Sequence, residues 1–140
     1  MAKNKKKPRA KEKPTRKKTV ALEPIKEGHV QWSFQIFDNF RWLAESGRDV
    51  PFREIAQKLR GYESMRWTDI ETNRWRDHPV KTESITPKAY KRLETVKQDD
   101  VTELWRFRFN GLARIWGTRV GDVFMALWWD PEHLVCPSNK

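Results

Sequence analysis

Residues 104–129, LWRFRFNGLARIWGTRVGDVFMALWW, show the clearest secondary-structure pattern in the chain, and the fold class is predicted from them first. Apolar and polar side chains alternate over 104–109, and a second segment of strand character follows over 112–118. Asn110-Gly111 between them is the strongest two-residue hairpin signal, because both central positions of a type I′ turn need positive φ. Val120-Gly121-Asp122 turns the chain again, and 123–129 is a nearly continuous apolar run, as in a strand covered on both faces. The stretch predicts three antiparallel strands.

Side chains that alternate along a strand point to opposite faces of its sheet. Arg106 and Arg108 therefore share one face of the first strand, while Trp105, Phe107 and Phe109 share the other. By the same rule, Trp128 and Trp129 point to opposite faces, so at least one of them belongs to the core.

Upstream of this stretch, the periodicity changes from that of a strand to that of helices. Residues 29–38 alternate like a strand, and residues 51–60 and 86–98 show helical spacing after the caps Asp49 and Thr86. Shorter helices are expected at 40–45 and at 64–71, the latter capped at Ser64 or Thr68, and a short edge strand at 134–136. The fold class is therefore α+β, with an N-terminal strand, two or three helices on one face, and a three- to four-stranded antiparallel meander.

Residues 1–28 differ from the rest of the chain. They hold eleven basic and three acidic residues, a net charge of +8, and have no aromatic side chain. Such a segment cannot bury enough apolar surface to offset its ordering entropy, so a disordered basic tail is expected at 1–28 and one folded domain at 29–140. The tail is either an arm that binds phosphates without specificity or a solubilising extension.

The single cysteine, Cys136, excludes an internal disulfide and any zinc site built from cysteines. The sequence shows no signal peptide and no apolar run of the ~20 residues that span a bilayer. A cytoplasmic protein without membrane contact is expected.

Residues 104–138 resemble the C-terminal sheet of the RelE/ParE toxin superfamily. The resemblance is closest in the strand end LWWDPEH, residues 127–133, and the following VCPS, residues 135–138, which look like a branch ending in LWWDPxHxVxPS. Residues 80–138 carry the resemblance well, residues 29–79 more weakly, and the tail not at all. It implies a RelE-like fold and, in the messenger-RNA interferases of the family, cleavage of RNA by a ribose 2′-OH.

The resemblance assigns roles to particular residues. Arg114 matches the family's phosphate-holding arginine, and His133 lies near the catalytic histidine of some members; Arg106 and Arg108 extend the cationic patch if they share its face. Non-catalytic alternatives stay open: Arg114 is an exposed strand arginine paired with a carboxylate, Arg106 and Arg108 lie on a solvated face, and His133 is a hydrogen-bonded loop residue. Asp130, Glu132 and His133 also raise a metal site, but no second ligand cluster supports it, so a metal-independent reaction without cofactor is expected.

Further contacts with RNA are assigned to two groups of side chains. Lys88, Lys91 and Arg92 on the helix at 86–98 could replace the lysine cluster of some relatives or form only its solvated face. A loop with the sequence Arg74-Trp75-Arg76 offers an aromatic ring between two cations for stacking on a base. The sequence departs from the family at Cys136, where many relatives have a catalytic tyrosine.

Three functions follow as hypotheses. The first is the toxin of a type II toxin–antitoxin system, an endoribonuclease that cleaves messenger RNA, with or without the ribosome, and is held inactive by a cognate antitoxin. The second is a non-enzymatic module of RelE/ParE fold that inhibits a protein or nucleic-acid target. The third is a nucleic-acid-associated protein that acts through the tail.

Overall fold

The computed structural model describes residues 21–22, 26–38, 50–73 and 76–137. Their α-helices and strands form an α+β fold with a five-stranded mixed sheet in the order β1-β5-β4-β3-β2. The elements in chain order are β1 (Gln31–Ser33), α1 (Phe52–Tyr62), α2 (Trp67–Thr72), β2 (His78–Lys81), a 3₁₀ turn (Thr82–Ser84), α3 (Pro87–Thr95), β3 (Glu103–Arg108), β4 (Arg114–Val120) and β5 (Val123–Asp130).

The meander predicted from the sequence is present as β3, β4 and β5, but it is the centre of a larger sheet. β1 lies parallel to β5 at one edge, and β2, which the sequence did not reveal, pairs antiparallel with β3 at the other. The expected strand at 29–38 is shortened to the three residues that pair with β5. The expected edge strand at 134–136 was wrong, because that segment forms bends beyond the end of β5.

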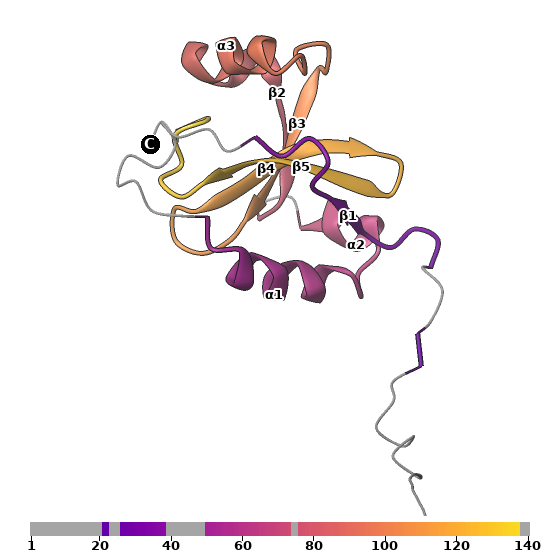
Figure 1. The fold of residues 1–140 in the computed structure, drawn as a ribbon. Helices are drawn as coiled ribbons and strands as arrows, with labels where there is room; N and C mark the ends of the chain where they lie inside the picture. The colour runs from indigo at the N-terminus through magenta and orange to yellow at the C-terminus, as the bar shows by residue number, and fades with distance from the viewer. Residues whose placement is uncertain (1–20, 23–25, 39–49, 74–75, 138–140) are drawn as a thin grey trace, which may run out of the picture.

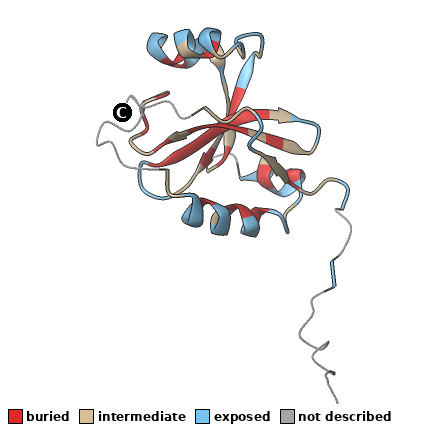
Figure 2. Cartoon of the chain, viewed as in Figure 1, coloured by how far each residue is buried: buried red, intermediate tan, exposed pale blue. Residues whose placement is uncertain are grey.

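Helices cover both faces of the sheet, so the expectation that they gather on one face was wrong. In Figure 1, α1 and α2 lie on one side of the sheet and α3 lies on the other. Figure 2 shows the central strands buried between these layers. Two apolar cores result: one joins α1 and α2 to side chains such as Phe107 and Phe124, and the other joins α3 to Leu104, Trp116 and Trp128.

The face assignment made from the alternating pattern is confirmed. Trp105, Phe107 and Phe109 belong to the core beneath α1 and α2, and Leu104, two residues before Arg106, belongs to the core beneath α3. Trp128 and Trp129 likewise face opposite cores, and Trp128 is fully buried.

A shift of register at Trp116 and Gly117 bends the central pair of strands. Trp116 lies opposite Trp128, whereas Gly117 lies opposite Ala126, so β5 holds one extra residue, as in a β-bulge. A Cβ atom at Gly117 would lie 2.2 Å from the carbonyl oxygen of Met125. Glycine is therefore required where β4 and β5 approach each other.

Several predicted turns and caps differ in detail. The hairpin between β3 and β4 is not a two-residue type I′ turn, because Phe109 N–H donates to Ala113 O and Asn110 lacks positive φ. α1 begins after Pro51 and ends at Tyr62, so Gly61 lies inside it. The cap of α3 is as expected: the hydroxyl of Thr86 accepts a hydrogen bond from the N–H of Ala89, although the helix ends at Thr95.

α2 is capped at neither Ser64 nor Thr68. Its N-cap is Arg66, whose backbone N–H donates to the carboxylate of Asp69. The helix expected at 40–45, the cap Asp49 and residues 1–20 and 23–25 of the tail lie outside the described residues. Gly28, the last residue of the predicted tail, is already bonded to the domain, because its N–H donates to Asp122.

Candidate functional site

Three arginines gather on the face of the sheet that α3 covers. In the pairing of the strands, Arg108 lies opposite Arg114, and Arg114 lies opposite Asp130 at the end of β5. Arg106 shares the face of Arg108, two residues away on β3. We call Arg106, Arg108 and Arg114 the arginine cluster. The sequence predicted the shared face of the first two, and the register adds the third.

Arg114 is held rigidly and is only 4% exposed. Its Nη1 donates hydrogen bonds to the backbone oxygens of Gly111, at 2.7 Å, and Ala113, at 2.9 Å. Its Nε is buried and has no hydrogen-bond partner. Arg114 is therefore oriented by the hairpin between β3 and β4 and keeps an unused donor.

Arg106 shows the same combination. Its Nη2 donates to the backbone oxygen of Arg76 at 2.9 Å, and its buried Nε lacks a partner. A buried donor without a partner costs free energy, about 1–3 kcal/mol, which a bound acceptor would recover. Two such donors on neighbouring strands give the cluster hydrogen-bonding capacity that the described residues leave unused.

Among the described residues, no carboxylate makes an ion pair with an arginine of the cluster; the ion pairs found there involve Arg76, Arg92 and Arg119. Burial, followed by the repulsion of the neighbouring arginines, lowers the pKa of Arg114, and the same causes lower the pKa of Arg106. Guanidinium groups nevertheless stay charged at neutral pH, so the cluster presents three positive charges to a ligand.

Two buried carboxylates, those of Asp77 and Asp130, accept hydrogen bonds from groups next to the cluster. Asp77 accepts hydrogen bonds from the hydroxyl of Tyr62, at 2.7 Å, and from the backbone N–H of Arg108, at 2.9 Å. Asp130, which is fully buried, accepts from the indole of Trp116 and from backbone N–H groups beyond β5. Asp77 also pairs with Arg76, and burial raises the pKa of Asp130, so positive charge exceeds negative charge around the cluster.

His133 follows β5 in the left-handed backbone region, with φ of +60°, which few non-glycine residues adopt. It is 9% exposed, and neither ring nitrogen makes a hydrogen bond to any residue that the structure describes. Burial, followed by the charges of the arginine cluster, lowers its pKa from the ordinary 6.5 to about 4. At neutral pH the imidazole is therefore uncharged and able to accept a proton.

The three residues of α3 that were predicted to bind RNA differ in their surroundings. Lys88 and Lys91 are exposed on the helix. Arg92 instead makes a bidentate pair with Asp38, through Nε at 2.8 Å and Nη2 at 2.7 Å, and thereby ties α3 to the chain that follows β1. This contact favours a structural role for Arg92.

The predicted loop at 74–76 is described only in part, because Arg74 and Trp75 lie outside the described residues. Arg76 offers its backbone oxygen to Arg106, and its guanidinium lies over the ring of Tyr62 with the centroid 5.6 Å away. It supports the arginine cluster through its backbone.

Cys136 does not replace the missing tyrosine. Its thiol donates a weak hydrogen bond to the backbone oxygen of Ser84, with 3.4 Å between sulfur and oxygen. Burial raises its pKa, which weakens it further as an acid.

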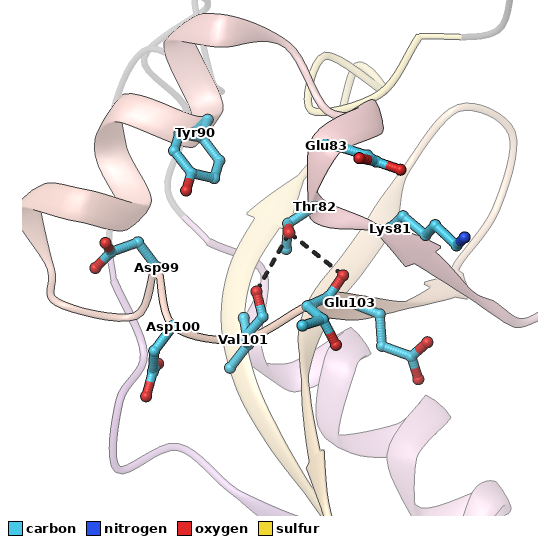
Figure 3. A pocket seen from close by; sticks show the side chains of 9 residues that line it. Lys81, Thr82, Glu83, Tyr90, Asp99, Asp100, Val101 and Glu103 are labelled. Atoms are coloured by element: carbon cyan, nitrogen blue, oxygen red, sulfur yellow. Dashed lines mark hydrogen bonds between the residues drawn. The ribbon is translucent and has the colours of Figure 1, made fainter.

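A hollow of about 430 Å³ near the start of α3 contains none of the predicted site residues. Figure 3 shows Tyr90 and Asp99 on one side of it and Lys81 and Glu83 on the other, with the hydroxyl of Thr82 bonded to backbone oxygens. Four carboxylates line it against one lysine; they are Glu83, Asp99, Asp100 and Glu103. This charge repels a phosphate, so the hollow is not the site of an RNA reaction.

The sequence did not reveal the roles of Asp77, Asp130 and Tyr62. A buried carboxylate next to a strand has no sequence pattern of its own, and the only available signal was the position of Asp130 directly after an apolar run.

No group of three or more His, Cys, Asp or Glu side chains that could hold a metal ion is present in the described part of the chain.

Comparisons with protein-family models, with curated proteins and with solved structures found no match to this chain. Among the helices of the described ranges, none combines the length and apolar character needed to cross a membrane.

Proposed function

We propose that this chain is a RelE-type endoribonuclease that cleaves messenger RNA, the toxin of a toxin–antitoxin pair. The observation that supports it most is the arginine cluster, in which two buried Nε donors lack partners. A phosphodiester supplies the acceptor oxygens that these donors need, and guanidinium groups bind phosphate in a bidentate manner. Cytoplasmic location, binding to the ribosome and inhibition by an antitoxin are parts of the same proposal.

In the proposed reaction, the 2′-oxygen of a ribose attacks the adjacent phosphorus and the bond from phosphorus to the 5′-oxygen breaks. His133 accepts the proton of the 2′-hydroxyl: its imidazole is neutral at the pH of the reaction, and the pKa of about 4, which makes the free site a weak base, rises when the negative charge of the bound phosphate offsets the arginines. The arginine cluster holds the nonbridging oxygens while negative charge develops on them. The leaving 5′-oxygen takes a proton from water, and the hydroxide that forms takes the proton from His133, so the products are a 2′,3′-cyclic phosphate and a 5′-hydroxyl and the imidazole is neutral again.

The excess of positive charge supports this assignment. A phosphodiester carries one negative charge, and the pentacoordinate phosphorus of the transition state carries one more. The guanidinium groups of the cluster stabilise this charge as it develops, which electrostatic catalysis favours.

The first experiment is induced expression in bacteria, with growth and total messenger RNA measured together. Wild-type protein should arrest growth and cleave messenger RNA, and Arg114→Met and His133→Ala should each lose both effects. Arg53→Met, an exposed change on α1 across the sheet, is the matched control and should retain them. Folded, partner-free wild-type protein that leaves messenger RNA intact, with and without ribosomes, would contradict the proposal.

Cys136 favours a second candidate, a non-enzymatic binding module of the same fold. Its bond to Ser84 leaves the leaving oxygen without an obvious acid from this chain. If this candidate is right, the double variant Arg114→Ala with His133→Ala still arrests growth while RNA stays intact. Loss of toxicity in that variant, together with loss of RNA cleavage, supports the nuclease instead.

A further inference from the structure

Asp130 uses both of its carboxylate oxygens in hydrogen bonds. Oδ1 accepts from the backbone N–H of Leu134 at 2.8 Å. Oδ2 accepts from the backbone N–H of Val135 and from the indole of Trp116, each at 3.0 Å. One side chain at the end of β5 therefore closes the loop that follows it and joins that loop to β4.

His133 lies inside the loop that Asp130 closes. Its backbone has φ of +60°, a conformation that costs a non-glycine residue about 1–2 kcal/mol and persists only where the surroundings enforce it. The two backbone donors to Asp130 come from the residues directly after His133. The carboxylate thus fixes the chain directly after His133 and can enforce this conformation.

The far end of the loop is anchored independently of Asp130. Val135 is fully buried in the core beneath α3, and its backbone oxygen accepts from the N–H of Thr86, the N-cap of that helix. The loop is therefore fixed at both ends, and Asp130 sets its path between them.

We propose that Asp130 is a positioning residue, which holds His133 against the arginine cluster by closing the loop at 130–135. The inference rests on the proposed function for its catalytic consequence, but the placement of His133 can be measured without any reaction. Arg114 lies opposite Asp130 in the sheet, so the same carboxylate lies beside the phosphate-holding arginine and the proposed base.

The test compares Asp130→Asn with Asp38→Asn. An asparagine at 130 turns an NH₂ group toward at least one N–H donor, so part of the loop loses its acceptor. Asp38 is a matched control: it too accepts three N–H hydrogen bonds, from Arg92 and Trp128, but it makes no bond to the loop. Both variants remove the negative charge of a carboxylate that accepts three hydrogen bonds on the α3 side of the sheet.

The measurements are the NMR titration of the His133 ring and the rate of RNA cleavage across pH. Asp130→Asn should raise the His133 pKa toward its ordinary value as the ring moves away from the arginine cluster, whereas loss of the carboxylate charge alone would lower it. The cleavage rate should fall at least tenfold, with binding of inorganic phosphate within twofold of wild type. Asp38→Asn should lower the thermal midpoint and leave the His133 titration unchanged. A His133 pKa that stays the same or falls in Asp130→Asn overturns the inference, whatever the cleavage rate.

A wild-type measurement covers the case in which Asp130→Asn does not fold. The amide protons of Leu134 and Val135 should exchange with solvent at least a hundredfold more slowly than unprotected amides, because Asp130 accepts both. Rapid exchange of both overturns the inference. If instead the wild type never cleaves RNA, the proposed function fails, and the His133 titration still decides the role of Asp130.

Discussion

Removing the charge of Arg108 tests the electrostatics of the site most cleanly. The side chain of Arg108 makes no hydrogen bond or ion pair to any described residue, and only its backbone N–H is bonded, to Asp77. Arg108→Gln therefore removes a positive charge beside His133 without breaking a side-chain contact. The pKa of His133, lowered to about 4 in the wild type, should rise toward its ordinary value.

The expected rise in the pKa of His133 is small. Arg108 is the smallest of the causes that lower this pKa, after burial, Arg114 and Arg106, so we expect a rise of about half a pKa unit, equivalent to about 0.7 kcal/mol. The assay is an NMR titration of the histidine rings between pH 3 and pH 8, with His29 and His78 as separate signals from the same molecule. Arg53→Gln, across the sheet, should leave His133 unchanged.

The same titration can refute the reasoning. A wild-type His133 that titrates at pH 6 or above would show that the arginine cluster does not surround it. A His133 pKa that does not respond to Arg108→Gln would show that their charges are not coupled. Either result would contradict the placement of the His133 ring beside the arginine cluster.

Three further predictions concern stability. Gly117→Ala should destabilise the fold by about 2 kcal/mol or more in urea unfolding, because its Cβ would meet the Met125 carbonyl oxygen at 2.2 Å; a change under 0.5 kcal/mol would contradict the bulge. Because the His133 pKa is lower in the folded state, the free energy of unfolding should fall by roughly 2–3 kcal/mol between pH 6.5 and pH 4, and His133→Ala should flatten that fall. Thr86→Ala should cost about 1 kcal/mol through the lost cap of α3, and an unchanged thermal midpoint would argue against the Ala89 contact.

The sequence predicted the parts of the fold that depend on local periodicity. Alternation over 104–109 assigned Arg106 and Arg108 to one face and the aromatic side chains to the other, as the structure shows. It did not reveal β2, because HPVK is four residues long and contains Pro79, which interrupts any strand pattern. A helical stripe shows that a helix has a buried side but not which face of the sheet it covers, so the one-sided arrangement was wrong.

The pattern within one strand predicts which of its residues share a face, but not which residues of other strands lie beside them. Arg114 joins its partners through the register of β3 and β4, which depends on the hairpin geometry. The parallel pairing of β1 with β5 joins segments about ninety residues apart, and no local signal encodes it. Asp77 and Asp130 are buried and accept hydrogen bonds from backbone N–H groups, and only the three-dimensional structure shows these contacts.

The central claim is that the arginine cluster and His133 cleave RNA. The most direct test is analysis of the ends produced when purified protein, free of partners, acts on messenger RNA with ribosomes present and a chelator added. Wild-type protein should produce 2′,3′-cyclic phosphate and 5′-hydroxyl ends, and His133→Ala and Arg114→Met should not. Intact RNA with the wild type, or the same ends in equal amount from both variants, would contradict the claim.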